Sequence, residues 1–288
     1  MLHSTLFRVG LLLTLRCSVE CRHCWFNCGP ERDESMTQSE VEYYLNEAAS
    51  NEATWVSFTG GEPFLYPDLL GNSIGYASSL GLRIEVVTNS YWANSFEDAM
   101  QSLIPLKENG LDVLNLSVDD YHQEQIPLEN IRNSFRAAEK TGLKTVFMIT
   151  LKKDSKITAE SLKKIFEGKT LLKIGESKAG DPDGLIIESP FIPIGRGENI
   201  KEEVYNEGKS STLCREMLTD IGIKPDGAVM PCCGPLGVLE EASLGNLREE
   251  SLSSILERAW NNPLFTDIRE QKFIDTSNRC VNCLTRFM

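Results

Sequence analysis

The sequence lacks a long apolar run. The longest apolar stretch near the N-terminus, residues 9–15, is interrupted by Gly10 and Thr14. It is far shorter than the roughly 20 residues that a membrane helix needs, and no small-residue cleavage site of a signal peptide follows it. We therefore expect no membrane association and a cytoplasmic location, where thiols stay reduced.

Positive charge is also scarce. The 288 residues include 29 Lys and Arg against 42 Asp and Glu, which gives a formal net charge of -13. The lysines at positions 152, 153, 163 and 164 are interleaved with acidic and hydroxyl residues, so no basic patch forms. A nucleic-acid partner is therefore disfavoured. Internal repeats and low-complexity segments are absent as well.

Cysteine, in contrast, is abundant. Nine cysteines fall in two groups towards the ends of the chain. In a reducing compartment, groups at such spacings indicate metal binding and not disulfides. Cys17, Cys21 and Cys24 directly follow an apolar segment, and three thiolates on a cubane iron-sulfur cluster leave one iron open for a cofactor or substrate. A zinc site completed by His23 or Cys28 is the alternative.

The middle of the chain alternates β-rich runs with amphipathic segments. Strands are expected at residues 6–15, 54–59, 82–88, 112–118, 143–151 and 185–188. Helices are expected at residues 37–50, 67–80, 96–109, 127–141 and 158–166, and most of them end at a glycine. This alternation predicts an α/β fold with a parallel sheet, and an incomplete (β/α)6 TIM-like barrel fits it better than an open sheet. Functional residues are then expected at the C-terminal ends of the strands.

A polar stretch at residues 195–212 predicts a linker. It would divide a barrel domain, residues 1–196, from a small C-terminal domain, residues 197–288. In the second domain we expect a β-hairpin with its turn at Pro225-Asp226-Gly227 and a helix at residues 251–260.

The first cysteine group belongs to a larger pattern. The spacing Cys-x-x-x-Cys-x-x-Cys after the first strand, joined to Gly60-Gly61-Glu62-Pro63 after the second, resembles the radical S-adenosylmethionine (SAM) superfamily. The resemblance covers residues 6 to about 194. It implies a 4Fe-4S cluster held by Cys17, Cys21 and Cys24, with SAM on the open iron. Reductive cleavage of SAM would give a 5′-deoxyadenosyl radical that removes a hydrogen atom from the substrate, and the electron would come from a donor such as flavodoxin or ferredoxin.

The resemblance also implies contacts to SAM. Gly60 and Gly61 would let the backbone approach the methionine end, and Glu62, followed by Pro63, would accept a hydrogen bond from its ammonium. Weaker matches are Asn89 at the end of the third strand, Ser117 and Asp119 at the end of the fourth, Lys152 after the fifth, and Ile192 in the segment that lines adenine in relatives.

The second cysteine group resembles the shortened, SPASM-type (twitch-like) extension of peptide-modifying radical SAM enzymes. Its implied ligands for an auxiliary 4Fe-4S cluster are Cys214, Cys232, Cys280 and Cys283. The full extension carries more cysteines after the last pair, whereas this sequence stops at Met288, so one auxiliary cluster is implied. A four-cysteine zinc site would use the same ligands.

Two cysteines remain after these assignments. Cys28 is expected to be a loop thiol. Cys233 is either a small buried hydrophobic residue or a thiol that faces the substrate and donates a hydrogen atom.

Several functions are compatible with these features. The leading hypothesis is modification of a ribosomally made peptide (RiPP), most simply L-to-D epimerisation with Cys233 as hydrogen donor. Thioether or carbon-carbon crosslinking of a peptide and dehydrogenation of a small molecule are alternatives. A non-catalytic iron-sulfur module would leave Glu62, Ser117 and Asp119 without a role. Because the sequence opens directly on the first strand, we expect no N-terminal leader-binding module within it.

Overall fold

A computed structural model describes residues 6–177, 180–205, 210–212, 214–270, 273–276, 279–284 and 286–287. The strands are β1 (Arg8–Thr14), β2 (Trp55–Gly60), β3 (Arg83–Thr88), β4 (Val113–Ser117), β5 (Lys144–Leu151), β6 (Leu171–Lys173), β7 (Gly184–Pro190), β8 (Ser210–Thr212), β9 (Asp220–Ile223), β10 (Ala228–Met230), β11 (Gly245–Asn246) and β12 (Phe273–Thr276). The helices are α1 (Gln38–Ser50), α2 (Pro67–Ser79), α3 (Phe96–Glu108), α4 (Leu128–Thr141), α5 (Ala159–Ile165), α6 (Leu252–Trp260), α7 (Pro263–Glu270) and α8 (Arg279–Leu284).

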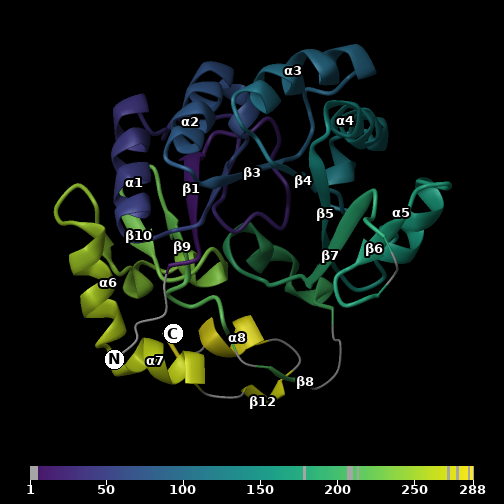
Figure 1. Cartoon of the computed structure of the whole chain (residues 1–288). Coiled ribbons are helices and arrows are strands. Elements are labelled where there is room, and N and C mark those ends of the chain that lie inside the picture. Colours follow the sequence, from purple (N-terminus) through teal and green to yellow (C-terminus); the bar gives the residue numbers. More distant parts are fainter. Residues whose placement is uncertain are drawn as a thin grey trace.

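One curved sheet runs through the molecule in the order β11-β10-β9-β1-β2-β3-β4-β5-β7-β6. From β1 to β6 its strands are parallel. Helices α1 to α4 form an arc along its outer face (Figure 1). This arrangement confirms the predicted α/β class and the partial-barrel core. Strand β6 was not predicted because its three residues are too few to show a period.

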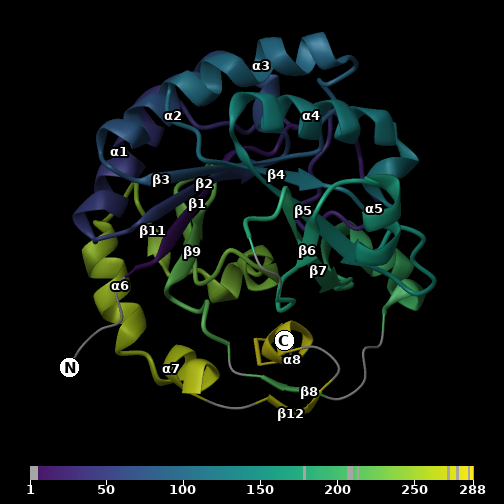
Figure 2. The same ribbon diagram turned by 45° about the vertical axis from the view of Figure 1, so that its right-hand side comes forward.

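The C-terminal segment extends the same sheet. Strand β9 pairs in parallel with β1, and β10 returns antiparallel to β9, which confirms the predicted hairpin. Elements α7, α8, β8 and β12 gather on the side of the sheet away from α3 and α4 (Figure 2). The sheet therefore runs across the domain boundary expected at residue 196, and that boundary stays a prediction.

Local signals explain where the barrel helices begin and end. At the start of α1, the Thr37 hydroxyl accepts from the Glu40 N–H at 3.3 Å, and the Glu40 carboxylate accepts from the Thr37 N–H at 2.8 Å. Helix α4 ends at Gly142, whose φ of 74° is favourable for glycine. Short connections of this kind return each helix to the next parallel strand, so the strands' C-terminal ends share one rim of the barrel.

The segment predicted as a linker is partly structured. Its first part forms a 3-10 helix, Gly195–Glu203, that contacts the cysteine loop, so it is not a free spacer. Residues 206–209 and 213 of this segment lie outside the described residues. No helix within the described ranges has both the length and the apolar character that crossing a membrane requires.

Candidate active site

The loop after β1 brings three cysteines to one cavity. Cys17, Cys21 and Cys24 all line a cavity of about 410 Å³. Burial raises the pKa of Cys17 to about 11, and Glu62 and Cys24 add to the effect. Burial also raises the pKa of Cys21, and the charge of Cys17 contributes. Thiolates that destabilise one another in this way suit a bound metal cluster, whose positive charge would remove the repulsion.

Cys28 supports this loop from within. Its backbone N–H donates to Cys24 Sγ at 3.4 Å. A hydrogen bond between the two side chains lowers the pKa of Cys24 to about 6 and raises that of Cys28. Cys28 thus acts as a donor to the sulfur of a candidate ligand.

Arg196 fastens the cysteine loop to the far end of the barrel. Its guanidinium donates to the carbonyls of Cys21 at 2.7 Å and Cys28 at 2.6 Å. Its backbone N–H donates to the carbonyl of Cys24 at 3.1 Å. No role for Arg196 was predicted from the sequence, because its partners lie between 168 and 175 residues earlier in the chain.

The glycines after β2 allow a close approach of two backbones. The Gly61 N–H donates to the Thr14 carbonyl at 2.6 Å, and the Glu62 N–H donates to the Arg16 carbonyl at 2.9 Å. A β-carbon on Gly61 would overlap the Arg16 carbonyl, and Gly60 has a φ of 123°. Only glycine fits both positions, so β2 and the cysteine loop are held against each other.

Glu62 is a fully buried carboxylate with 0% exposure. It accepts hydrogen bonds from the Phe64 N–H at 3.1 Å, the Thr88 hydroxyl at 2.9 Å and the Asn89 N–H at 2.8 Å. Burial raises the pKa of Glu62 to about 7, although these bonds oppose the rise. Thr88 and Asn89 line the cavity, whereas Glu62 and Pro63 do not reach its wall.

Other predicted SAM contacts divide into two sets. Asn89 donates to Cys17 Sγ at 3.6 Å, and Ser117 lines the same cavity. Lys152 and Ile192 do not line it. The Lys152 ammonium instead pairs with Glu203 at 3.1 Å.

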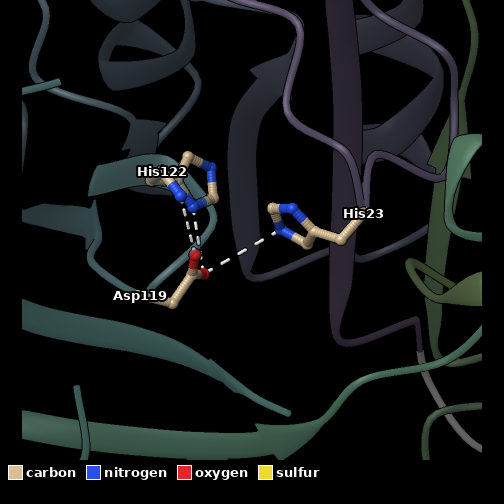
Figure 3. Close-up of side chains that lie close together, drawn as sticks. All are labelled: His23, Asp119 and His122. Carbon is tan, nitrogen blue, oxygen red and sulfur yellow. Dashed lines mark hydrogen bonds and ion pairs between the residues drawn. The ribbon is translucent and has the colours of Figure 1, made fainter. Parts of the chain in front are cut away.

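Asp119 is engaged in a cluster with two histidines (Figure 3). His122 Nδ1 lies 3.0 Å from its carboxylate and His23 Nε2 lies 3.9 Å away. Burial alone would raise the pKa of Asp119, but His122 and His23 outweigh it and hold the pKa below its ordinary value. Burial lowers the pKa of His23 to about 4, so this ring is neutral at pH 7. The histidines line the cavity and Asp119 does not, so Asp119 orients His122.

The second cysteine group surrounds a smaller cavity of about 140 Å³. Its lining includes Cys214, Cys232, Cys280 and Cys283. The pKa of Cys232 is raised first by burial and then by the charges of the other three. The four predicted auxiliary ligands are therefore brought together, although Cys214 lies 66 residues before Cys280 in the sequence (280 − 214).

Cys233 lies between the two sites. It and Arg8 are the two residues that line both cavities. Cys233 Sγ packs against β1 where Gly10 has no side chain, since a β-carbon there would overlap the sulfur. Burial raises the pKa of Cys233 to about 12, and Asp220 adds to the effect. Cys233 therefore remains a protonated thiol at neutral pH.

Arg8 and its two acidic partners were not predicted from the sequence. Arg8 Nε donates to Asp220 at 3.0 Å, and Nη1 donates to Glu85 at 2.7 Å. The sequence did contain a hint of this cluster. Arg8 and Glu85 are charged residues in parallel strands that are mostly apolar.

Comparison with known families agrees with this geometry. Residues 11–165 match the model of the radical SAM superfamily, and residues 214–284 match the model of an iron-sulfur cluster-binding domain. The first match covers more than half of the 288 residues, and the chain belongs to the radical SAM superfamily. It is therefore an enzyme whose cofactors are SAM, the 4Fe-4S cluster that binds SAM, and an auxiliary iron-sulfur cluster in the C-terminal region.

Individual relatives are more distant. The chain is 24% identical over 272 residues to the putative peptide biosynthesis protein YydG of Bacillus subtilis (strain 168), a match that covers 92% of this chain and 81% of YydG. It is 22% identical over 299 residues to the antilisterial bacteriocin subtilosin biosynthesis protein AlbA of the same organism, and covers 62% of that protein's length. Streptococcus suis SuiB bound to S-adenosylmethionine has the same fold, with a TM-score of 0.61 at 16% identity over 93% of this chain and 68% of SuiB.

Proposed function

We propose that this radical SAM enzyme acts on a peptide and converts an L-residue into its D-epimer, with Cys233 as the hydrogen-atom donor. The observation that carries the proposal is the place of Cys233 on the wall of both cavities. A peptide substrate is supported by the relatives YydG and AlbA, whose names assign them to peptide and bacteriocin biosynthesis.

The assignment of ligands is part of this proposal. Cys17, Cys21 and Cys24 would hold the SAM-binding cluster, and Gly60, Gly61, Glu62, Asn89 and Ser117 would surround SAM. Cys214, Cys232, Cys280 and Cys283 would hold the auxiliary cluster. Glu62 lies directly behind the cavity wall, because it accepts hydrogen bonds from Thr88 and Asn89, which line the cavity. Lys152 and Ile192 are not included, because neither lines the cavity and Lys152 pairs with Glu203.

The chemistry divides between the bound cofactors and the residues of the chain. When bound and reduced, the cluster and SAM supply a 5′-deoxyadenosyl radical that takes the Cα hydrogen of one peptide residue. The Cys233 S–H bond then breaks and a C–H bond forms on the opposite face of Cα, which leaves a thiyl radical on sulfur. One electron from an external donor such as flavodoxin or ferredoxin and one proton from solvent would restore the thiol. The auxiliary cluster, held by the cysteines next to Cys233, would supply electron-transfer chemistry at this place.

The test uses deuterated water. The reduced holoenzyme is incubated with SAM and a pool of synthetic peptides of random sequence, and the products are analysed by mass spectrometry and chiral amino-acid analysis. Because thiol hydrogens exchange with solvent, an epimerised residue is expected to gain one deuterium at Cα. Cys233→Ala is expected to form 5′-deoxyadenosine but transfer no deuterium.

Cys28→Ala is the matched control, because Cys28 is the other surplus cysteine and also lines the cavity. It should keep deuterium transfer per 5′-deoxyadenosine formed, because loss of its bond to Cys24 acts on SAM cleavage and not on hydrogen donation. Transfer that survives Cys233→Ala but not Cys28→Ala would move the donor role to Cys28. A product that lacks two hydrogens and carries no deuterium would instead identify a crosslinking enzyme.

A further inference from the structure

Asn115, on β4, is a buried amide whose side chain has no hydrogen-bond partner within the described part of the chain. It is 5% exposed and lines the 410 Å³ cavity. Asn130 and Asn133 are also 5% exposed, yet both donate to backbone carbonyls at 3.1 Å. An asparagine amide offers two donors and one acceptor, and leaving them unpaired in a buried place is costly. Asn115 is therefore the exception that points to a ligand.

The neighbouring strands β2 and β3 carry further polar side chains with atoms that make no hydrogen bond within the described part of the chain. One Glu85 oxygen accepts from Arg8 at 2.7 Å, while the other has no partner among the described residues. Ser57, 3% exposed, has no side-chain hydrogen bond within the same ranges. Both residues line the cavity. We refer to Ser57, Glu85 and Asn115 as the polar wall.

The polar wall lies deeper than the groups that would surround SAM. Asn115 precedes Ser117 by two residues on the same face of β4, which places it roughly 7 Å further from the rim. Ser57 pairs in register with Gly10 and Glu85, and Cys233 Sγ packs against Gly10. Ser57 and Glu85 are thus level with the Cys233 thiol, and Asn115, which pairs with Val87, lies two residues nearer the rim.

Beside Asn115 the wall becomes apolar. Val146 and Met148 of β5 and Ile187 of β7 line it, and Thr150 of β5 lies nearer the rim. A peptide residue whose Cα lies between the rim and Cys233 has an amide on each side of that carbon. At the depth of Ser57, Glu85 and Asn115, polar side chains that can bind those amides lie on β2, β3 and β4.

We propose that the polar wall binds the backbone amides of the reacting residue in the substrate. The Asn115 amide nitrogen donates to the carbonyl oxygen of the amide before the reacting Cα, and the open oxygen of Glu85 accepts the N–H of the amide after it. Arg8 holds Glu85 in place as a positioning residue. The inference rests on the proposed function to the extent that the substrate is a peptide.

The first measurement is thermal stability of the holoenzyme. Asn115→Leu replaces an unpaired amide with an apolar group of similar size, so the melting temperature is expected to stay the same or rise. Asn133→Leu is the matched control and should melt earlier, because it leaves the Ala93 carbonyl unpaired. A melting temperature that is unchanged or higher in Asn115→Leu would show that Asn115 does not stabilise the fold, which supports a role in binding.

The second measurement is binding of a defined probe. N-acetylalanine N-methylamide carries the two secondary amides of one peptide residue, and its contact with SAM-loaded holoenzyme is followed by saturation-transfer NMR. Transfer is expected in the wild-type protein and in Asn133→Leu below its melting temperature. In Asn115→Leu, affinity should fall roughly tenfold. N-acetylalanine methyl ester, which lacks one N–H, should bind the wild-type protein more weakly than the amide.

Equal saturation transfer in Asn115→Leu and wild type, or no transfer in wild type, would overturn the proposal. So would an Asn115→Leu variant that melts as early as Asn133→Leu, since the amide would then be structural. The two proposals fail in different ways. If the enzyme were a peptide crosslinker, the amide probe would still bind to the polar wall, but no deuterium would be transferred to the peptide.

Discussion

The cysteine loop after β1 places three candidate ligand thiols on a cavity of about 410 Å³, whereas the C-terminal group places four candidate ligands on a cavity of about 140 Å³. The first group shares its cavity with glycines, hydroxyl groups and the polar wall. The second is lined mainly by its own cysteines and the residues next to them. Three ligands leave a coordination position open, and four close it.

This difference assigns separate tasks to two sites made of the same amino acid. An open position beside a large cavity suits cofactor cleavage and substrate binding. Four ligands beside a small cavity suit a cluster that transfers electrons to a neighbouring group. Cys233, which lines both cavities, is the neighbouring residue.

Removal of one ligand from each site is the strongest test of the comparison. Cys21→Ala is expected to lower SAM cleavage by roughly a thousandfold or more and to remove about four irons per chain. Cys280→Ala is expected to lose a similar amount of iron and abolish deuterium transfer, yet keep SAM cleavage within roughly tenfold. Iron analysis and 5′-deoxyadenosine assays measure both. Equal loss of SAM cleavage in the two variants would contradict the division of tasks.

The junction between the sites is tested at two glycines. Gly10→Ala places a β-carbon against Cys233 Sγ. The backbone of Cys233 cannot easily move away, because its N–H donates to the Asp220 carbonyl at 2.7 Å. We expect deuterium transfer per 5′-deoxyadenosine to fall roughly a hundredfold, because a displaced thiol no longer meets the substrate. Gly222→Ala meets only the flexible end of Met230 and should change transfer little.

A stability cycle checks the same contact without substrate. Gly10→Ala should destabilise the protein, but not in a Cys233→Ala background, where the sulfur is absent. Additive losses of stability would show that the two residues do not compete for this space.

Glu62 allows a further test of the first cysteine site, where three candidate ligands leave a coordination position open. Glu62→Gln is expected to weaken SAM binding roughly tenfold or more, because Thr88 and Asn89, which line the cavity, lose the charged acceptor that holds them. With a pKa of about 7, Glu62 becomes ionised as pH rises through neutrality, so wild-type affinity for SAM should increase between pH 6 and 7.5. Calorimetric titration of the variant should show a flatter profile. Glu203→Gln, which removes the charge that pairs with Lys152, is the control and should keep the wild-type slope.

The smallest effect concerns His23 beside the open site. The pKa of His23 is lowered to about 4 in the folded protein, while an unfolded histidine titrates near 6.5. The unfolded chain therefore binds more protons between these values, and stability is lost as pH falls from 6.5 towards 4. At pH 5 this loss is at most about 2 kcal/mol, since the neighbouring Asp119 and His122 also titrate.

His23→Phe keeps the stack on Tyr121, whose ring centroid is 4.5 Å away, and removes this titration. The free energy of unfolding of the variant minus that of the wild type should be larger at pH 5 than at pH 7.5, as measured by anaerobic urea unfolding. An equal difference at both values would show that His23 does not carry the pH dependence.

Sequence reasoning reached the fold class, most strands and the two cysteine groups because these depend on short spacings and periods. Cys17, Cys21 and Cys24 lie within one loop, so their meeting at one cavity follows from local order. Arg8, Glu85 and Asn115 come from three different strands, and their meeting at one cavity depends on strand order and register, which short spacings do not reveal. Lys152 was expected to contact SAM, and its pairing with Glu203, 51 positions away, could not be foreseen from local spacing.

The Arg196 contact has a consequence for biosynthesis. The three carbonyls that it holds belong to a loop made early, and the guanidinium arrives 175 residues after Cys21. A nascent chain shorter than this has its first thiols but not the clamp that shapes their loop. The loop therefore gains its full set of hydrogen bonds only after residue 196, and with it every strand from β1 to β7, has been synthesised.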